Sequence, residues 1–173
     1  MELAALAALS PCDGDLMYQD FVARIRQNYI TRAENRASHC SAYFLPYDPQ
    51  SQTVFMVDHR KSGLWLSPGG YLEPGETLIY TLNRETKEEL GIERSFSGRE
   101  KPFMLSISDI ANPSQECFTH FDVRYLLQND GRDFQPDSRE VKETRWLDFH
   151  DARNLVTDRA TLRALDIVEG NRT

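Results

Sequence analysis

The sequence predicts an α/β protein of the α+β kind, in which a mixed β-sheet lies between helices as an α/β/α sandwich. Three observations support this fold class. Short β-rich runs separated by turn residues occupy much of the chain, one long helical pattern lies among them, and further helical patterns flank the strands at both ends. Because a sheet and helices bury their apolar faces against each other, this order favours helices on both sides of a sheet.

The first part of the chain predicts one helix followed by a β-hairpin. Over residues 15–28, apolar side chains recur at helical spacing, which indicates an amphipathic helix that precedes the sheet. Two apolar, β-rich runs follow at 41–45 and 53–57. Segment 46–49 between them contains two prolines and an aspartate and is typical of a turn.

The middle of the chain combines the longest helical pattern with two further strands. The helix is expected to begin near Thr77, a good N-cap residue, and to end at about residue 90, where Gly91 is suited to close it. Residues 103–107 predict a strand. Residues 117–127 predict a longer one, in which apolar residues alternate on one face.

The last part of the chain predicts a loop, a short strand and a helical end. Polar residues fill the segment 129–140, and residues 144–147 have β composition. In the C-terminal region, Leu162, Leu165 and Val168 recur at helical spacing and mark the side that we expect to be buried.

The length of 173 residues fits a single domain spanning 1–173. We expect residues 1–37 to form an N-terminal extension with one helix and residues 38–173 to form the core. Hydrophobic residues make up 40% of the chain and charged residues 27%, which is ordinary for a soluble protein with a substantial core.

The net charge of −7 restricts the class of partner. A protein that grips polymeric nucleic acid by its phosphates normally shows a basic face. An acidic protein would need metal ions to offset its repulsion of an anionic ligand. We therefore expect a small-molecule ligand and no polymeric nucleic acid; whether the chain forms a homodimer is left open.

The cysteines and the termini indicate a soluble, cytoplasmic protein. Cys12, Cys40 and Cys117 are widely spaced and form no CxxC pair, so we expect three reduced thiols. The apolar opening segment 1–9 is short and lacks a basic flank, so we expect a frayed or packed terminus instead of a targeting signal. No apolar run approaches the roughly 20 residues that a membrane span requires.

Three carboxylates are expected to crowd one face of the helix at 77–90. Glu85, Glu88 and Glu89 follow the spacing i, i+3 and i+4, so they are neighbours on the helix surface. Arg84 relieves part of their mutual repulsion, but a negative cluster remains. Mg²⁺ prefers a few carboxylate oxygens together with waters and substrate phosphates, so this cluster predicts a magnesium site, with Mn²⁺ as a substitute.

A glycine-rich loop lies just before this helix. Gly69, Gly70 and Gly75 allow the backbone to approach a ligand or metal ion closely. The loop differs from a P-loop because Gly75 is followed by Glu76, where a P-loop has a lysine. Loop and helix together are therefore suited to gather cations that hold a polyphosphate.

Residues 70–92 resemble the Nudix box, G-x5-E-x7-R-E-U-x-E-E-x-G-U, in which U is a bulky aliphatic residue. The one departure is Thr86 at the first U position, where threonine is close in volume to valine and is expected to pack. The matching positions are Gly70, Glu76, Arg84, Glu85, Glu88, Glu89, Gly91 and Ile92. A chance match at the seven of these positions that are not aliphatic, without Ile92, has a probability on the order of one in a million from average residue usage.

The resemblance implies a Nudix fold and hydrolysis of nucleoside diphosphates linked to another group. It implies that Arg84 and Glu76 pair to orient the helix and loop, and that Gly70 and Gly91 are structural. It also implies attack of a metal-activated water on one phosphorus, with Glu85 as a candidate base. The implied metal ligands are Glu85, Glu88, Glu89 and the carbonyl of Gly69.

Weaker candidates lie outside the box. Glu140 and Glu143 precede the strand at 144–147; such a loop often supplies a further carboxylate in Nudix enzymes, with Glu140 the better candidate, and a solvated charged loop is the alternative. Trp65 and Tyr71 flank the glycine loop and are candidates to stack on a base, although core packing is favoured for Trp65.

Polar residues on the strand at 117–127 are candidates to line the substrate cleft. His120, Asp122 and Arg124 alternate along one face, and a cross-strand polar face without ligand contact is the alternative. The remaining histidines have no identifiable partner in the sequence, so we expect surface positions for His39, His59 and His150.

Two other functions compete with hydrolysis. A non-catalytic Nudix-like nucleotide-binding or regulatory module would usually lose box carboxylates, and all are present here. An accessory domain for DNA repair or RNA processing fits poorly with the acidic charge. Sequence signatures of several Nudix substrate groups are absent, and Ser108 stands where many ADP-ribose enzymes have proline. A nucleoside triphosphate and a nucleotide sugar remain as the candidate substrates.

Overall fold

The computed structural model describes residues 16–93, 96–110, 117–128 and 133–171 of the chain. The apolar opening segment, Cys12 and part of the expected loop at 129–140 lie outside these residues. Within them, no helix has the length and apolar character needed to cross a lipid bilayer.

The sheet has seven strands, and its central ladder follows the order β3-β2-β1-β6-β5. In addition, β4 pairs with β1, and β7 pairs with β2. The β1–β6 pair is parallel and every other pair is antiparallel, so the sheet is mixed. The strands are β1 (Ser38–Asp48), β2 (Thr53–His59), β3 (Leu64–Leu66), β4 (Gly69–Tyr71), β5 (Met104–Asp109), β6 (Thr119–Gln128) and β7 (Val141–Leu147).

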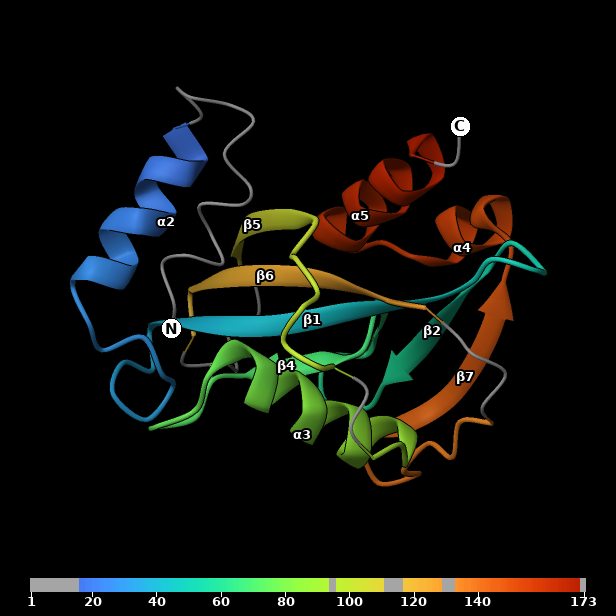
Figure 1. The fold of residues 1–173 in the computed structure, drawn as a ribbon, viewed down its shortest axis with the longest axis horizontal. Coiled ribbons are helices and arrows are strands. Elements are labelled where there is room, and N and C mark those ends of the chain that lie inside the picture. Colours follow the sequence, from blue (N-terminus) through green and yellow to red (C-terminus); the bar gives the residue numbers. More distant parts are fainter. Residues whose placement is uncertain (1–15, 94–95, 111–116, 129–132, 172–173) are drawn as a thin grey trace.

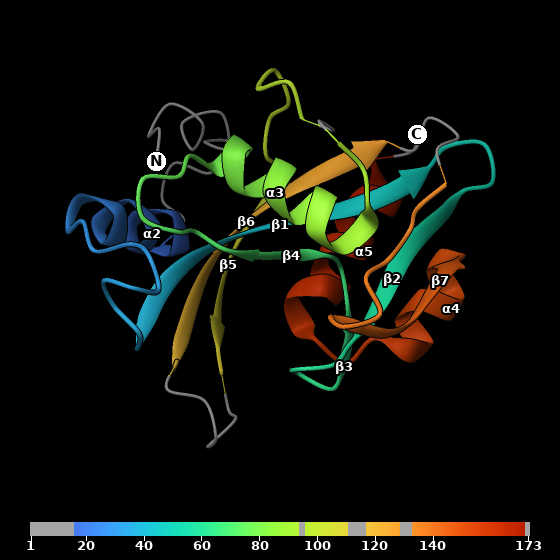
Figure 2. The same cartoon turned by 90° about the horizontal axis from the view of Figure 1, so that it is seen from below.

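Helices cover both sides of this sheet, which confirms the predicted fold class. In Figure 1, α3 lies below the sheet and α4 and α5 lie above it, and Figure 2 shows α3 in front of β1 when the molecule is seen from below. The helices are α2 (Leu16–Arg26), α3 (Leu78–Leu90), α4 (Phe149–Leu155) and α5 (Arg159–Gly170).

The apolar core is divided between the two sides because side chains alternate along each strand. On β1, Phe44 packs in the cluster that contains Leu82 of α3. The next residue, Leu45, packs in the cluster that contains Phe149 of α4 and Leu165 of α5. Each side of the sheet therefore anchors its own helices.

Most predicted elements are confirmed, with shifted ends. The helix expected at 15–28 is α2, and the strands expected at 103–107 and 117–127 are β5 and β6. The strand expected at 144–147 is β7, which begins three residues earlier. The C-terminal region divides into α4 and α5, and Leu165 and Val168 of α5 are buried as expected.

The expected turn at 46–49 is wrong for Pro46, because β1 continues through it to Asp48. The N–H of Phe44 donates to the carbonyl of Pro68 on one edge of β1. Since backbone groups alternate along a strand, the nitrogen of Pro46 faces that same edge. Pairing with β2 begins only at Tyr47, so the missing donor of Pro46 costs the sheet no hydrogen bond to β2.

Candidate active site

The carboxylate helix α3 begins and ends as its sequence predicts. Thr77 is the N-cap, and its hydroxyl accepts a hydrogen bond from the N–H of Tyr80. Gly91 has a positive φ of 68° and donates its N–H to the carbonyl of Lys87, which closes the helix. Thr86 is buried, and its hydroxyl donates to the carbonyl of Leu82 at 2.5 Å. The threonine at the aliphatic position thus leaves no unpaired polar atom.

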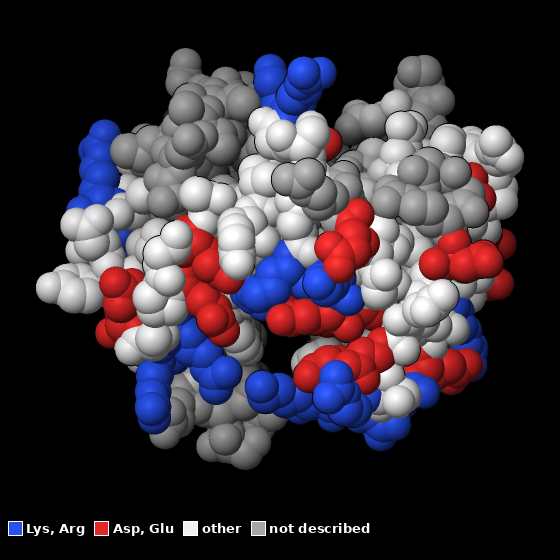
Figure 3. Space-filling view, turned by 60° about the horizontal axis from the view of Figure 1, so that its bottom comes forward, with Lys and Arg blue, Asp and Glu red and all other residues white. Residues whose placement is uncertain are grey.

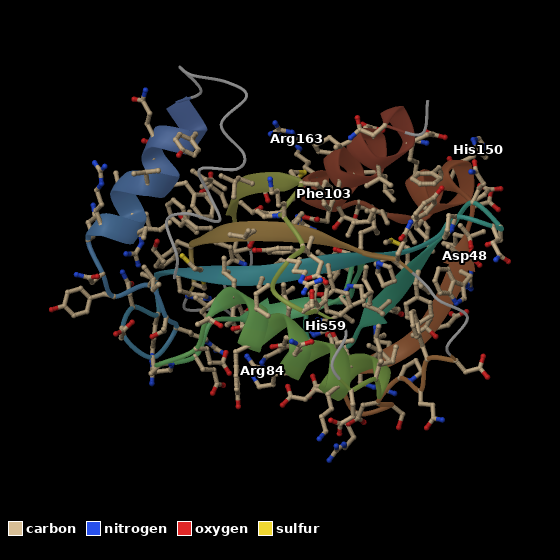
Figure 4. The ribbon with its side chains drawn as sticks, viewed as in Figure 1. Asp48, His59, Arg84, Phe103, His150 and Arg163 are labelled. Atoms are coloured by element: carbon tan, nitrogen blue, oxygen red, sulfur yellow. The ribbon has the colours of Figure 1, made fainter. Side chains whose placement is uncertain are left out.

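Arg84 connects α3 to the loop and strand that precede it. Its Nε and Nη2 donate to the two carboxylate oxygens of Glu76, at 2.8 and 3.0 Å. Nη2 also donates to the carbonyl of Tyr71, and Nη1 donates to Glu85 and Glu88 at 2.5 and 3.1 Å. Figure 4 shows Arg84 beside α3. A planar guanidinium can make these bonds together, so this one side chain sets the position of the helix relative to the loop.

Glu85 and Glu89 are buried carboxylates, whereas the side chain of Glu88 is 55% exposed. Burial raises the pKa of Glu85 to about 7, although the adjacent Arg84 opposes this shift. Burial also raises the pKa of Glu89 well above its usual value, and the charge of Glu85 adds to the effect. The cause in both cases is that a carboxylate with little access to water favours its neutral form.

The glycine pair packs directly against these carboxylates. The N–H of Gly69 donates to Glu89 Oε2 at 2.7 Å, and Gly69 has φ of 144°, which side-chain-bearing residues rarely adopt. A Cβ atom on Gly70 would lie 2.0 Å from Oε1 of Glu85. Glycine at position 70 therefore allows the Glu85 carboxylate to lie beside the backbone of β4, and a larger residue would displace it.

This donor set suits a hard divalent cation. Three carboxylates and the nearby backbone of Gly69 are oxygen-rich, and the repulsion among them is only partly offset by Arg84. Glu85, Glu88, Glu89 and Gly69 all line one cleft, so a cation held by them would face it. These residues therefore fit a divalent cation of the kind that the box resemblance implies.

The cleft has a volume of about 1100 Å³. Figure 3 shows a hollow on the face that carries α3, with acidic and basic side chains side by side at its rim. Beyond the carboxylates, the lining includes side chains from β5, β6 and the start of α5. Its cationic residues are Arg32, Lys61, Arg124, Arg159 and Arg163. These cations are suited to contact an anionic ligand whose charge the metal ion does not fully offset.

Part of the polar face of two parallel strands forms the floor of the cleft, where Tyr43, His120, Asp122 and Arg124 line it. His39, Ser41 and Tyr43 of β1 pair in register with His120, Asp122 and Arg124 of β6. Because alternate residues share a face, these six side chains lie on the same side of the sheet.

Arg124 is the buried cation of this floor. Its Nη1 donates to the hydroxyl of Ser67 at 2.9 Å, and its guanidinium stacks 4.7 Å from the ring centre of Tyr43. The carboxylates of Asp122 and Asp158 each lie 3.8 Å from Nη2. Its Nε is buried and has no hydrogen-bond partner among the described residues.

Asp122 is the matching buried anion. Ser106 and Ser108 donate to its Oδ2 at 3.3 and 3.1 Å, while its Oδ1 has no partner in the described part of the chain. Burial raises its pKa to about 6, against the opposing charge of Arg124. An unpaired buried polar atom is costly, and both Oδ1 of Asp122 and Nε of Arg124 are enclosed, although the side chains that carry them are part of the cleft lining.

The structure brings most of the sequence-predicted residues to this cleft. The lining includes Tyr71, His120, Arg124 and Glu140 in addition to the box carboxylates. Trp65 is not part of the lining: it packs with the cluster on the α4 and α5 side, under the guanidinium of Arg145. The geometry thus supports the favoured packing role of Trp65, and gives no support for base stacking by it.

Some predictions for residues outside the box are corrected. His39 was expected at the surface, but it is fully buried, because it lies on the polar face of β1 and not in a loop. His59 lines the cleft and bonds to Ser62, whereas His150 is exposed as expected. Glu143 pairs with Arg145 away from the cleft.

Several cleft residues were not found from the sequence. Arg32, Arg159 and Arg163 come from a loop and from α5, far from the box in sequence, and carry no motif. Figure 4 labels Arg163 on α5, across the sheet from Arg84. One signal was available for His39, because it continues the period-two pattern of Ser41 and the other polar residues of β1.

Comparison with known proteins agrees with this geometry. The family model described as NUDIX domain matches residues 38–165. The NAD-capped RNA hydrolase NudC of Chromobacterium violaceum is 25% identical over 134 residues, which cover 68% of this chain but only 45% of that protein. The asymmetrical bis(5'-nucleosyl)-tetraphosphatase of Mus musculus is 28% identical over 118 residues, or 65% of this chain and 76% of that one.

Solved structures share the fold. The Escherichia coli dihydroneopterin triphosphate pyrophosphohydrolase matches with a TM-score of 0.63 and 20% identity over 75% of this chain and 95% of its own. The NUDIX domain of Shewanella oneidensis NrtR, in complex with ADP ribose, matches with a TM-score of 0.63 and 18% identity. That match covers 87% of this chain and 98% of the other.

Proposed function

Because the chain belongs to the NUDIX domain family, we propose that it is a Mg²⁺-dependent hydrolase of a phosphoanhydride bond in a nucleoside diphosphate linked to another group. The observation that carries this proposal is the arrangement around Arg84. Its bonds to Glu76, Glu85 and Glu88 hold the carboxylates of α3 against the glycine backbone at the open cleft. The box residues therefore lie together at the cleft, which supports the proposal.

The reaction transfers one phosphoryl unit to water. A new bond forms between the water oxygen and a phosphorus, the bridging P–O bond breaks, and a carboxylate accepts the proton of the attacking water. Bound Mg²⁺ would offset the phosphate charge and lower the pKa of water. We assign the proton acceptor to Glu85, which is buried beside Gly70, with Glu140 on the cleft wall as the alternative.

The cleft supports a small nucleotide as substrate. Its volume of about 1100 Å³ is at the upper end of typical ligand pockets, which is room for a nucleotide with an additional group. Asp122 and Arg124 give the floor of the cleft a polar character that suits a nucleotide. The net charge of −7 disfavours a long nucleic acid partner. A nucleoside triphosphate or a nucleotide sugar fits this description.

A panel of substrates with and without Mg²⁺ tests this function. The panel contains nucleoside triphosphates, nucleotide sugars, ADP ribose, a dinucleoside tetraphosphate and an NAD-capped RNA. We expect Mg²⁺-dependent release of a phosphate-containing product from at least one small nucleotide. Hydrolysis of the capped RNA alone would contradict the small-molecule assignment. Nucleotide binding by calorimetry without any turnover would support a binding module and overturn hydrolysis.

Two matched variants test the role of Glu85. Glu85→Gln keeps the volume of the side chain but removes its charge, so kcat should fall by at least about 10²-fold, while the melting temperature without metal stays equal or rises slightly. Glu143→Gln is the control, because Glu143 is half-exposed and lies outside the cleft. Near-parental turnover by Glu85→Gln would move the proton acceptor to Glu140.

A further inference from the structure

A second group of candidate metal ligands lies at the same cleft, where one of its three side chains, His120, is part of the lining. His39 on β1 and His120 on β6 are register partners, and Cys117 lies just before β6. All three side chains are buried, and one donor atom from each lies within 4.8 Å of the others. None of the three belongs to the carboxylate site, and the box pattern does not include them.

We propose that His39, Cys117 and His120 form a binding site for Zn²⁺ that shares no ligand with the carboxylate site. The inference concerns a binding site and does not depend on the hydrolytic function. Its basis is the buried, unpaired Nε2 of His120, the spacing of the three side chains and the chemistry of two imidazoles with one thiol.

The hydrogen bonding of His39 leaves one ring nitrogen available. Its Nδ1 lies 3.3 Å from the carbonyl of Asn35, so with the proton on Nδ1 the ring donates to that carbonyl. This leaves the lone pair on Nε2, and Sγ of Cys117 lies 3.7 Å from Nδ1 and 3.8 Å from Nε2. A backbone carbonyl that fixes the second nitrogen is the usual support of a metal-bound histidine.

The separation between these two atoms is close to that in a tetrahedral zinc site. With Zn–S of about 2.3 Å and Zn–N of about 2.0–2.1 Å, tetrahedral geometry separates the two ligand atoms by roughly 3.6 Å. The distance from Nε2 of His39 to Sγ of Cys117 is within a few tenths of an ångström of that value, but Sγ is equally close to Nδ1, so a side-chain rotation must bring Sγ toward the Nε2 lone pair. Closing the wider separations of up to 4.8 Å requires a side-chain adjustment of about 1 Å.

His120 supplies an independent indication. Its side chain is buried, with 6% of the residue exposed, yet its Nε2 has no hydrogen-bond partner among the described residues. A buried nitrogen without a partner costs about 1–3 kcal/mol, because the water that it lost is not replaced. A metal ion bound between His120 and the other two side chains would take the place of that partner.

The surroundings hold both imidazoles in position. The ring of Tyr71 packs edge-on against His39 and His120, at centroid distances of 4.6 and 5.2 Å. The guanidinium of Arg32 lies over the same ring, 5.0 Å from its centre.

The donor types select the ion. Two nitrogens and one sulfur suit Zn²⁺, whereas Mg²⁺ prefers oxygen. Among the described residues, no fourth histidine, cysteine or acidic residue joins the cluster. His120 and Tyr71 line the cleft, so the fourth position would be open to water or to a ligand atom from that side.

Cobalt spectroscopy on the whole protein tests the site. In excess Mg²⁺, one equivalent of Co²⁺ should give a near-ultraviolet thiolate-to-cobalt absorption band, and Zn²⁺ should abolish it. Cys117→Ser should lose the band. Cys40→Ser is the matched control, because Cys40 is a buried thiol next to His39 but belongs to the apolar cluster on the other side of β1. Loss of the band in Cys40→Ser, with the band retained in Cys117→Ser, would overturn the proposal.

Further measurements separate this site from the carboxylates. Glu89→Gln should keep the cobalt band, whereas His120→Asn should lose it and should lower Zn²⁺ affinity by at least about 10-fold. Zn²⁺ should raise the melting temperature of the parent protein, and less so that of His120→Asn. Absence of the band in the folded parent protein, or its loss in Glu89→Gln with retention in His120→Asn, would contradict the proposal. Neither result bears on whether the carboxylate site hydrolyses nucleotides.

Discussion

Gly70→Ala separates the position of the catalytic carboxylate from the stability of the fold. Gly70 does not lie in the left-handed region of φ, so its backbone conformation is available to alanine. The added Cβ would lie 2.0 Å from Oε1 and 2.4 Å from Cδ of Glu85, whereas ordinary contact begins at 3.4 Å. The carboxylate oxygen must therefore move by about 1.4 Å.

The magnitude follows from what holds Glu85. Its Oε1 accepts from Arg84 at 2.5 Å, so a displacement of that size breaks the geometry of this bond and of any cation site beside it. A misplacement of about 1 Å typically costs about 10²-fold in rate. The free energy of unfolding should change by less than about 1 kcal/mol. Replacing glycine restricts the unfolded chain and so stabilises the folded state by roughly 0.4–1 kcal/mol, which offsets part of the strain.

The assay measures kcat as a function of Mg²⁺ concentration on the substrate identified by the panel, together with the melting temperature. We expect kcat to fall by about 10²-fold or more, and half-saturation to shift to higher Mg²⁺. Gly170→Ala is the control, since a Cβ there meets nothing within 4 Å. Parental kcat and Mg²⁺ dependence in Gly70→Ala would refute the assigned place of Glu85.

Arg84→Lys should lower the free energy of unfolding by about 1–3 kcal/mol and reduce kcat, because lysine cannot make the bidentate contact with Glu76. Arg145→Lys, at an exposed ion pair, is the control and should lower the free energy of unfolding by less than about 1 kcal/mol. Chemical denaturation measures both free energies. In the metal-free protein, burial lowers the pKa of His39 and His120 from 6.5 to about 4, so the unfolded chain takes up protons first as the pH falls. The protonation of each histidine should therefore lower the free energy of unfolding by up to about 3 kcal/mol between pH 6.5 and 4. His120→Asn should lose less stability than the parent protein over this range. Identical pH profiles of stability for the two proteins would contradict the assignment.

The sequence predicts the box helix well because its determinants are local. The cap at Thr77, the glycine at position 91 and the i, i+3, i+4 carboxylates all act within one helix, and each is found where it was expected. A threonine at the aliphatic position 86 is also compatible with the helix for a local reason, because its hydroxyl donates to the carbonyl of Leu82 one turn earlier. Local rules of this kind need no knowledge of the tertiary fold.

The floor of the cleft could not be predicted in the same way, because it depends on which strands pair. The parallel register that sets His39 beside His120 joins residues 81 positions apart, and the box gives no information about it. Strands β3 and β4 were read only as a glycine-rich segment, since three residues are too few to show a period. The turn predicted at Pro46 was wrong because it also depends on strand pairing. The missing N–H of Pro46 costs nothing only because pairing with β2 does not include this residue.

The alternation of side chains along β1 also separates the polar side chains of the cleft from the apolar core beneath α3. On β1, even-numbered residues such as Phe44 enter the core beneath α3, which leaves the opposite face of the same strand for His39 and Tyr43. The carboxylates reach the cleft from α3 and present oxygen, whereas the proposed zinc ligands are two imidazole nitrogens on β1 and β6 and the sulfur of Cys117 just before β6. Since Mg²⁺ prefers the first kind of donor and Zn²⁺ the second, the two proposed sites would select different ions from one solution.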